Sequence, residues 1–346
     1  MKQSWRQGRG NRVRVLRVAL AIAVAVLLTL GALYWLGQML ERGWRREEPR
    51  GDLTARFTQA PTVVLHGEAY RPRDRLTTVL IIGVDRAPTE PTEQTAYRNG
   101  GQSDYLMLLI IDDENQTVTP LQIDRDTMAE VTTLGVLGNV TGTRSTQICL
   151  AHGFGDGGKQ SCELTRDAVG RLLLGIDIQY YLAVDLGGIA TLNDALGGVT
   201  VTLQDDFSAL DPAMVKGTTL TLRGAQAEHF VRSRVNTGIG TNAARMVRQQ
   251  QYWEGLSRSF SQRLAQAGGA DLTARLLDVM EPCLTTNMKR GRIVNEVWNT
   301  RGYRRLATVH PTGEYAVGQD GFIEFHADAA ALESFVIQTF YQKAAR

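Results

Sequence analysis

The stretch TTVLIIGVD, residues 77–85, decides the fold. Its side chains are β-branched or aliphatic up to Gly83, and the run ends at Asp85. A second such run, YLMLLIID, follows at 105–112, and a third segment, TVTPLQID at 117–124, alternates between apolar and polar residues. Continuous apolar strands of this kind are typical of a sheet that is covered on both faces. We therefore expect these three segments to form the buried centre of one sheet.

The remainder of the chain alternates between helical and strand patterns. The segment at 86–101 contains two prolines and predicts a loop. Helical spacing is found at 164–174, 187–196, 224–232, 243–265 and 327–342, and strand patterns at 179–185, 199–203 and 304–309. This alternation predicts an α/β fold, with an α–β–α sandwich around a largely buried mixed sheet.

Charge is distributed unevenly along the 346 residues, although the net charge is only +2. The first 50 residues carry 10 Lys and Arg against 3 Asp and Glu, and the remaining residues carry 28 against 33. A protein that binds nucleic acid without sequence preference needs a basic surface to displace counterions from the phosphates. The main part of the chain lacks this excess, so we expect no nucleic-acid partner.

The basic residues flank VALAIAVAVLLTLGALYWL, an uncharged stretch of 19 residues at 18–36. About 20 apolar residues are needed for a helix to cross a membrane, and Tyr34 and Trp35 suit its interface. The basic residues ahead of this stretch predict a cytoplasmic amino terminus by the positive-inside rule. A cleaved signal peptide is the alternative, although its apolar region is usually shorter. We expect a single-pass protein of the cell membrane, with a cytoplasmic basic tail at 1–17, a transmembrane helix at 18–37, an extracellular stalk at 38–75 and a folded domain at 76–346.

Export makes the cysteines informative. Cys149 and Cys162 bracket the glycine-rich segment LAHGFGDGGKQS, and disulfides persist outside the cytoplasm. We therefore predict a disulfide between these two residues, with a pair of buried free thiols as the alternative. Cys283 is left over, and the five histidines are scattered along the chain, so a zinc centre is not expected.

Charged side chains stand at the ends of the predicted strands. Asp85, Asp104 and Arg125 share this position, and ligands of open α/β sheets gather at strand ends. Two converging carboxylates without histidine or cysteine suit a hard cation such as Mg²⁺. The alternative is that both aspartates cap turns.

The stretch HFVRSRVNTGIGTNAARMVRQQQ, residues 229–251, holds four arginines and no acid. Arg245, Arg248 and Gln249 have the spacing of one helix face, and Arg232 and Arg234 are two residues apart. A guanidinium is shaped to bind carboxylate or phosphate. The stretch therefore predicts either acids from elsewhere in the fold or an anionic ligand, and a solvated basic face is the third alternative.

Six segments resemble, in order, the motifs of the LytR–CpsA–Psr (LCP) family of the bacterial envelope. They are TTVLIIGVDR, GQSDYLMLLIID, PLQIDRDT, VDLGGIATLNDALGGVTVTLQDDF, LRGAQAEHFVRSR and ARMVRQQQ. The resemblance covers about residues 76–342 and implies an α–β–α sandwich with an apolar tunnel for a polyprenyl tail. It also implies a membrane-anchored transferase with possible pyrophosphatase side activity. Such an enzyme takes a glycopolymer from an undecaprenyl pyrophosphate carrier and joins it to peptidoglycan through a phosphodiester bond.

Carried over to this sequence, the resemblance implies roles for particular residues. Asp85 and Asp104 are expected to hold Mg²⁺ against the pyrophosphate. The expected catalytic and pyrophosphate-binding residues are Arg125, Arg232, Arg234 and Arg245, and Gln249 and Gln102 are further pyrophosphate-binding residues. Because this predicts arginines without counter-charge in the ligand-free protein, we expect Arg234→Ala to leave its stability unchanged or higher.

The sequence also departs from the family pattern. Gln102 stands where the family often has arginine, and Gln147 and Cys149 replace a lysine and an asparagine of another motif. The segment 236–242 contains no aspartate, although the family usually has one there as a candidate base for the acceptor hydroxyl. These departures favour a second hypothesis, a non-catalytic regulator of envelope assembly that binds polyprenyl phosphates.

Overall fold

In the computed structural model of this protein, the described residues are 63–65, 67–85, 100–135, 140–233, 242–267 and 269–344. Apart from Val63, these residues belong to one compact unit, Val64–Arg346. The predicted tail at 1–17, the predicted transmembrane helix at 18–37, most of the predicted stalk and Arg234 lie outside the described residues. Within the described residues, no helix has the length and apolar character that crossing a membrane requires.

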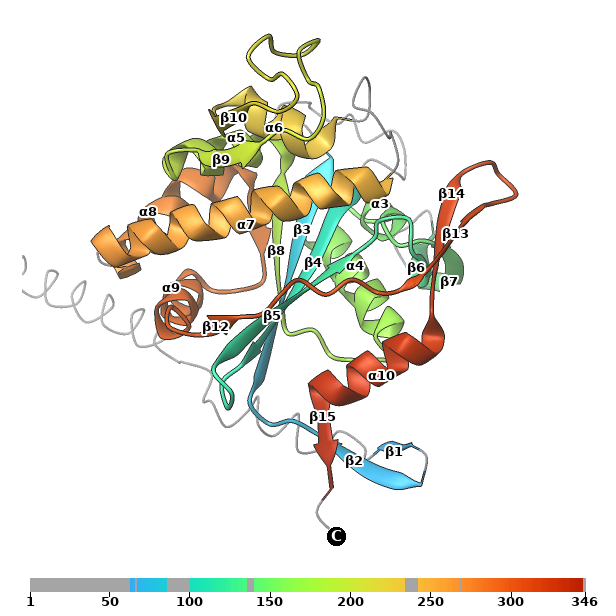
Figure 1. Ribbon diagram of the computed structural model, residues 1–346. Coiled ribbons are helices and arrows are strands. Elements are labelled where there is room, and N and C mark those ends of the chain that lie inside the picture. The colour runs from blue at the N-terminus through green and yellow to red at the C-terminus, as the bar shows by residue number, and fades with distance from the viewer. Residues whose placement is uncertain are drawn as a thin grey trace, which may run out of the picture. The chain divides into compact units, whose positions relative to one another are not determined.

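A mixed sheet of six strands forms the centre of this unit, in the order β11-β8-β3-β4-β5-β12 (Figure 1). The strands are β3 (Leu76–Asp85), β4 (Gln102–Asp112), β5 (Thr117–Ile123), β8 (Tyr180–Asp185), β11 (Leu284–Thr286) and β12 (Arg304–Arg305). The pairs β3–β4, β4–β5 and β8–β11 are antiparallel, whereas β3–β8 and β5–β12 are parallel. The prediction that the three apolar runs occupy the middle of one mixed sheet is confirmed.

One face of the sheet is closed by α3 (Leu150–Gly153), α4 (Lys159–Leu172) and α10 (Ala329–Phe340). Leu80 of β3, Leu108 of β4, Val169 of α4 and Val336 of α10 belong to one buried cluster on this side. The alternation of the strand side chains sends these leucines to one face and their neighbours to the other. This side of the molecule is therefore a conventional packed core.

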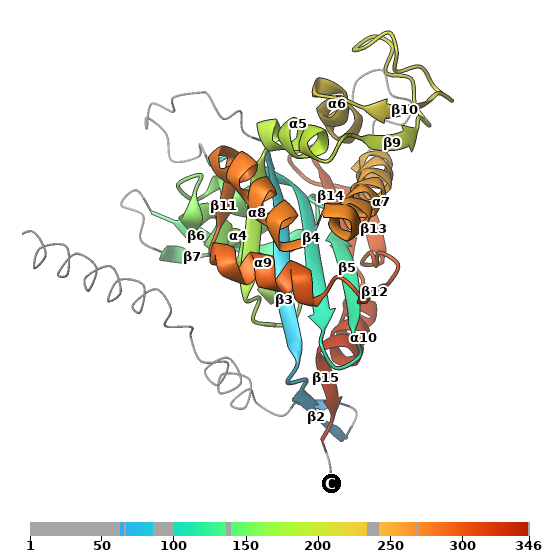
Figure 2. The same cartoon turned by 90° about the vertical axis from the view of Figure 1, so that its left-hand side faces the viewer.

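The opposite face is covered by α7 (Asn242–Ala267), α8 (Gly269–Met280) and α9 (Arg290–Asn299), with α5 (Leu186–Ala195) packed against α8 (Figures 1 and 2). Leu264 of α7 joins Leu272 and Leu276 of α8 in a small buried cluster. Helices on both faces of the sheet give the predicted α–β–α sandwich.

Other elements lie outside the central sheet. The hairpin of β9 (Val199–Thr202) and β10 (Thr219–Leu222) packs with α6 (Ala225–Arg232) around its own buried cluster, so the strand predicted at 199–203 is real but peripheral. Two hairpins were not predicted, β6 (Met128–Leu134) with β7 (Val140–Gln147), and β13 (Gly313–Val317) with β14 (Ile323–Ala327). The remaining elements are β1 (Val63–Leu65), β2 (Glu68–Pro72), η1 (Glu281–Cys283) and β15 (Tyr341–Lys343).

Several predicted boundaries differ from the structure, and three of them are changes of element or of several residues. Residues 68–72, which the sequence places in the stalk, form β2 and pair antiparallel with β15. The helix predicted at 164–174 begins earlier, at Lys159, because the end of the glycine-rich segment is already helical. The strand predicted at 304–309 is reduced to Arg304–Arg305.

Candidate functional site

The antiparallel order of β3, β4 and β5 brings their charged residues to one edge of the sheet. Asp85 at the end of β3 lies opposite Gln102 at the start of β4. The end of β5 lies opposite Leu106, and Arg125 follows two residues after β5 ends. The sequence predicts that Asp104 precedes the strand, but in the structure it is the third residue of β4. Three of the predicted site residues thus converge.

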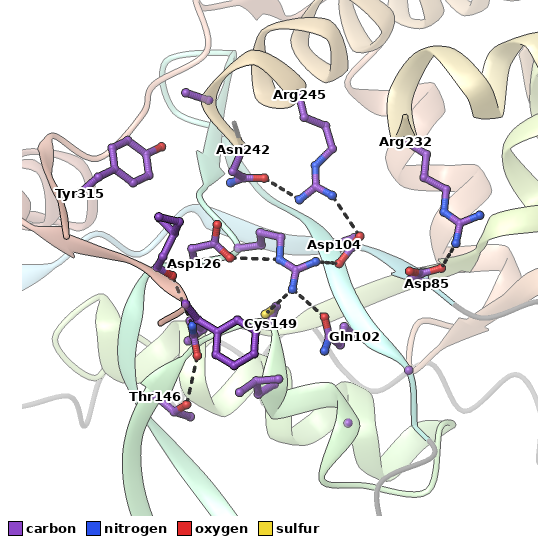
Figure 3. A pocket seen from close by; sticks show the side chains of 18 of the residues that line it. Asp85, Gln102, Asp104, Asp126, Thr146, Cys149, Arg232, Asn242, Arg245 and Tyr315 are labelled. Carbon is purple, nitrogen blue, oxygen red and sulfur yellow. Dashed lines mark hydrogen bonds and ion pairs between the residues drawn. The ribbon is translucent and has the colours of Figure 1, made fainter. Parts of the chain in front are cut away.

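Ion pairs connect these residues to the arginines of α6 and α7 (Figure 3). Arg125 and Arg245 each donate to a different oxygen of Asp104, the second at 3.2 Å from Nη1 to Oδ2. Arg232 at the end of α6 donates from Nη2 to Oδ1 of Asp85 at 2.9 Å. We call Asp85, Asp104, Arg125, Arg232 and Arg245 the charged cluster. Both aspartates pair with arginines here, so they are more than turn caps.

The acids that the arginine-rich stretch lacks come from other elements of the fold. Arg248 donates from Nη1 to Oδ2 of Asp205 at 2.7 Å and from Nη2 to the carbonyl of Ser233 at 2.6 Å. Arg232 and Arg245 have aspartate partners in the charged cluster. The expectation of arginines without counter-charge is therefore wrong for Arg232 and Arg245. Arg234 lies outside the described residues, so its prediction stays untested.

A chain of hydrogen bonds holds Arg245 in place. The side chain of Arg245 is 2% exposed, and its Nη2 donates to Oδ1 of Asn242, the first residue of α7. Asn242 donates in turn from Nδ2 to Oδ1 of the buried Asp124. The hydroxyl of Tyr315, from β13, donates to the other oxygen of Asp124. Burial and this hydrogen bond raise the pKa of Tyr315, so the phenol stays protonated.

The two glutamines that were predicted to contact pyrophosphate lie at different depths. Gln102 lines the open side of the charged cluster, and its Oε1 accepts from Nη2 of Arg125 at 2.5 Å. Gln249 is buried, where its Oε1 accepts from Nε2 of Gln122 at 3.3 Å. Gln102 therefore stands beside the guanidinium of Arg125, whereas Gln249 lies one turn of α7 beyond Arg245.

The predicted disulfide is absent, because Cys149 and Cys162 are both buried free thiols with separate partners. The sulfur of Cys149 lies 3.2 Å from Nη2 of Arg125, whereas that of Cys162 lies 3.9 Å from Nε2 of His152. Burial raises the pKa of Cys149 to about 11, although Arg125 acts in the opposite direction. Burial lowers the pKa of Arg125, but Cys149, Asp104 and Asp126 raise it more, so the guanidinium stays charged.

The charged cluster opens into a cleft of about 1410 Å³, which we call the outer cleft. Asp85, Asp104, Arg232 and Arg245 line this cleft and also a narrow passage of about 160 Å³. Apart from these residues, the passage is lined mainly by apolar side chains such as Ile81. The charged cluster thus stands where a polar cleft changes into an apolar passage.

The passage leads to an inner cavity of about 810 Å³ between the sheet and helices α7 to α9. Five side chains line both spaces, which are Ile81, Val184, Leu192, Trp253 and Leu256. Further into the cavity the walls are Leu109 and Ile111 of β4 and Phe260 of α7. The outer cleft, the passage and the inner cavity therefore adjoin one another, with charged and polar side chains gathered at the outer cleft and mainly apolar ones around the other two spaces.

The donor set of the charged cluster fits a Mg²⁺ ion that also binds phosphate. Asp85 and Asp104 come from adjacent strands, and their side chains are 35% and 17% exposed. Mg²⁺ is usually held by one or two carboxylates, with water and substrate phosphates as its other ligands. Within the described part of the chain, no group of three His, Cys, Asp or Glu could hold a metal ion. Two carboxylates completed by a phosphate therefore match this residue set better than an all-protein metal site.

Sequence reasoning missed four residues around the cluster, which are Asp124, Asp126, Asn242 and Tyr315. Asp124 and Asp126 flank Arg125, so their position at a strand end was a usable signal. Asn242 belongs to the segment 236–242, which stands out in the sequence only by its lack of aspartate, whereas here it bridges Arg245 and Asp124. Tyr315 carries no local signal, since a long-range contact from an unpredicted hairpin brings it to the site.

The family description "LytR_cpsA_psr family" matches residues 56–337 of this chain. The chain belongs to this family. Among curated proteins it resembles "Polyisoprenyl-teichoic acid--peptidoglycan teichoic acid transferase TagU" of Bacillus cereus (strain AH820), with 28% identity over 54% of this chain and 56% of that protein. The TagU of Halalkalibacterium halodurans is 27% identical over 68% of this chain and 69% of that protein. The match thus spans little more than half the length of the first of these relatives.

Solved structures have the same fold. TagV of B. subtilis superposes with a TM-score of 0.59 and 23% identity, covering 77% of this chain and 96% of that one. A structure described as TagT bound to LI-WTA superposes with a TM-score of 0.56 and 18% identity, covering 80% and 94%. The expected fold of the LCP resemblance is therefore confirmed.

Proposed function

We propose that this protein is a transferase that moves a glycopolymer from an undecaprenyl pyrophosphate carrier onto peptidoglycan through a phosphodiester bond. The observation that carries the proposal is the position of the charged cluster, which lies between the outer cleft and two adjoining spaces with mainly apolar walls. A polyprenyl pyrophosphate has the matching chemistry, with a long apolar tail joined to a strongly anionic group. The names of the TagU relatives, which specify a polyisoprenyl-linked teichoic acid and peptidoglycan, support the same substrate class.

In this proposal the tail occupies the passage and the inner cavity, and the pyrophosphate lies at the charged cluster. Arg125, Arg232 and Arg245 exchange their aspartate partners for phosphate oxygens, which accept hydrogen bonds in the same forked geometry. Asp85 and Asp104 are then free to hold Mg²⁺, which would neutralise charge that develops on the phosphates. The ion pairs of the ligand-free protein therefore keep both sets of residues close to the positions that the ligand needs.

The proposed reaction exchanges one phosphorus–oxygen bond for another. The oxygen of an acceptor hydroxyl bonds to the phosphorus that carries the glycopolymer, and the bond from that phosphorus to the bridging oxygen breaks. Polyprenyl monophosphate leaves, and the hydroxyl proton passes to a base. Phosphoryl transfer depends mainly on positioning and on neutralising charge, which is what three fixed guanidiniums provide.

Release of polyprenyl monophosphate is the test of catalysis. The compact unit Val64–Arg346 is incubated with Mg²⁺, a saccharide linked to polyprenyl pyrophosphate, and peptidoglycan fragments. The proposal expects polyprenyl monophosphate together with a saccharide that has become attached to the fragment. Monophosphate without attachment would indicate the pyrophosphatase side activity, with water as the acceptor. Binding of the lipid with neither product would rule out the transferase.

The second candidate is a non-catalytic receptor that binds polyprenyl phosphates and regulates envelope assembly. Asn242 is the observation that favours it, because this residue at the mouth of the site is an amide and cannot accept the hydroxyl proton. The segment 236–242 offers no aspartate in its place. The same incubation separates the two candidates, since a receptor would return its lipid unchanged.

A membrane anchor at 18–37 would place the inner cavity near a supply of lipid carrier. This single-pass arrangement, with a cytoplasmic amino terminus and an extracellular domain, remains a prediction from the sequence. Protease added outside intact cells that have lost their wall should digest the domain after residue 40. Complete protection of the domain would contradict this topology.

A further inference from the structure

The hairpin β13–β14 presents one apolar face and one polar face. Tyr315 lies opposite Phe325, and Val317 lies opposite Ile323, so these four side chains share a face. The intervening pairs, among them Glu314 with His326, point to the other side. An apolar hairpin face normally covers a core. The face of Tyr315, Val317, Ile323 and Phe325, with Phe322 beside it, is called here the hairpin face.

Most of the hairpin face is uncovered. Phe325 is buried, but Val317 is 69% and Phe322 is 65% exposed. Tyr315, Phe322 and Ile323 line the outer cleft, next to the charged cluster. Large apolar side chains that are exposed together beside a cleft indicate a surface that contacts another molecule. The hairpin face therefore has the character of a binding surface.

Contacts at the base of the hairpin fix it against the site. The backbone N–H of Phe325 donates to the carbonyl of Asp126 at 2.8 Å, and Nε2 of Gln147 donates to the carbonyl of Ile323 at 3.3 Å. The hydroxyl of Tyr315 donates to Asp124, and its ring packs on Phe325 with centroids 5.0 Å apart. A hairpin of two strands is marginally stable by itself, so these contacts determine where its rings lie. Figure 3 shows Tyr315 at one side of the same pocket as Asp126 and Arg245.

Polar side chains surround the aromatic ones in the outer cleft. Arg144 and Gln147 come from β7, and Asp320 comes from the turn of the hairpin. A sugar ring has both characters, because its C–H faces pack on aromatic rings while its hydroxyls need hydrogen-bond partners. The volume of about 1410 Å³ exceeds the roughly 300–1,000 Å³ of most small-molecule pockets, as a chain of several sugar rings requires.

We propose that the hairpin face binds the sugar rings of a saccharide chain beside the phosphate that is transferred. The location rests on the proposed function, since it assumes that a phosphate lies at the charged cluster. A lipid tail fits this face less well, because the inner cavity on the other side of the cluster has mainly apolar walls. The glycopolymer of the donor and the glycan of the acceptor share this chemistry, and the two probes of the experiment distinguish these sources.

The test measures saccharide binding without any lipid. Wild-type domain is titrated by calorimetry or NMR with two probes, a lipid-free teichoic acid oligomer and a peptidoglycan glycan oligomer. We expect one of them to bind, and Phe322→Ala to weaken that binding about tenfold, which corresponds to about 1.4 kcal/mol and is within the range of an aromatic contact. The probe that binds identifies the donor or the acceptor as the source. Tyr315→Phe keeps the ring and should lose less affinity than Tyr315→Ala.

Two controls make the result interpretable. Trp298 of α9 is an exposed aromatic residue outside the outer cleft, so Trp298→Ala should bind the saccharide as wild type does. Polyprenyl pyrophosphate without sugar should bind the Phe322→Ala variant as tightly as the wild type. Equal saccharide affinity in Phe322→Ala and wild type, or no affinity for either probe, would overturn the inference. Failure of the sugar-free lipid to bind the wild type would instead count against the proposed function.

Discussion

Arg245 and Arg248 differ in function although they occupy the same face of α7. Both side chains are buried, but Arg245 reaches Asp104 in the charged cluster while Arg248 reaches Asp205. Arg248 also lies over the ring of Phe207, 5.6 Å from its centroid, and so joins α7 to the peripheral hairpin region. Spacing along a helix predicts which residues share a face, and tertiary partners then decide their roles. The sequence alone cannot separate an arginine of the charged cluster from one that pairs with the peripheral hairpin region.

Replacing Arg245 by alanine should destabilise the protein. The side chain is almost completely buried, and its loss leaves Asp104 with one arginine partner and Asn242 without its donor. We expect a loss of about 3 kcal/mol, the lower end of the range for removing one partner of a buried ion pair. Denaturation by urea, followed by circular dichroism, measures this loss.

Arg290→Ala is the matched control for Arg245→Ala. Arg290 also pairs with an aspartate, Asp278, but both side chains are at least half exposed. Exposed ion pairs contribute about 0–1 kcal/mol, so this variant should unfold close to the wild-type midpoint. If the two variants lost equal stability, the arginine of the charged cluster would have no special role in the ligand-free fold.

The cysteines should behave as three free thiols. In denaturant and without reductant, alkylation should add three groups to the intact mass, because neither Cys149 nor Cys162 has a disulfide partner in the structure. In the folded protein at pH 8, Cys149 should react slowly, because burial and a pKa of about 11 keep its thiol protonated. A mass with only one added group would restore the disulfide prediction.

The elements that could be predicted from sequence are those whose pattern reflects burial. The central strands β3 and β4 carry continuous apolar runs and β5 an alternating one, whereas α7 and α10 carry helical patterns, so both kinds of element were predicted. The hairpin β6–β7 was missed because β7 reads VTGTRSTQ and is mostly exposed, which leaves no hydrophobic period. The hairpin β13–β14 was missed although its face is apolar, since two short strands separated by a glycine-containing turn give a weak signal.

The strand predicted at 304–309 shows a limit of a different kind. Backbone bonds from Arg304 to Gln116 and from Leu306 to Val118 begin a parallel ladder with β5. The next bond comes from Val309 to Pro120, so the pairing slips by one residue. Pro120 of β5 has no backbone N–H to donate to the neighbouring segment 306–309, and the ladder is interrupted at this residue. The apolar pattern was read correctly, but the interruption is caused by a residue of the partner strand.

Close packing of α7 on the peripheral hairpin gives a prediction for Gly255. A Cβ atom at this position would overlap the side chain of Val199 in β9. Alanine normally favours a helix over glycine by roughly 1 kcal/mol, but overpacking of a core contact costs about 1–3 kcal/mol. We expect Gly255→Ala to lower the melting temperature.

Gly291 in α9 provides the comparison for Gly255. A Cβ atom there would meet nothing within 4 Å, so only the helix preference acts. Gly291→Ala should therefore raise the melting temperature slightly. Calorimetry of both variants distinguishes the two effects, and a higher melting temperature for Gly255→Ala as well would show that α7 moves away from β9 easily.

At the scale of the whole domain, the two faces of the sheet are covered in different ways. Helices α4 and α10 pack on one face as a core, whereas α7, α8 and α9 surround the inner cavity on the other. The strand residues of both faces are equally apolar, so the sequence predicts that helices cover them. It does not show whether those helices fill the space, because this depends on how far each helix stands from the sheet.

Narrowing the passage should separate the recognition of the tail from that of the pyrophosphate. Leu192 of α5 lines both the passage and the inner cavity, so Leu192→Trp would add bulk between them. Each buried CH₂ contributes about 0.8 kcal/mol, and excluding even a few isoprene carbons should therefore weaken binding at least about tenfold. We expect this loss for undecaprenyl pyrophosphate and no loss for geranyl pyrophosphate, with affinities measured by calorimetry. Leu192→Ala is the control, and equal losses for both lipids would show that the tail lies elsewhere.

The paired state of the arginines also has a consequence for competition among anions. Inorganic phosphate or sulfate would have to displace aspartates that already lie 2.9–3.2 Å from Arg232 and Arg245, and it would gain no apolar contact in return. In the proposed mode of binding, an anion that carries its own hydrophobic chain would recover that loss by entering the inner cavity. The ion pairs of the ligand-free protein thus disfavour small anions. Abundant phosphate or sulfate should therefore neither occupy nor inhibit the site at concentrations where a scarce lipid still binds.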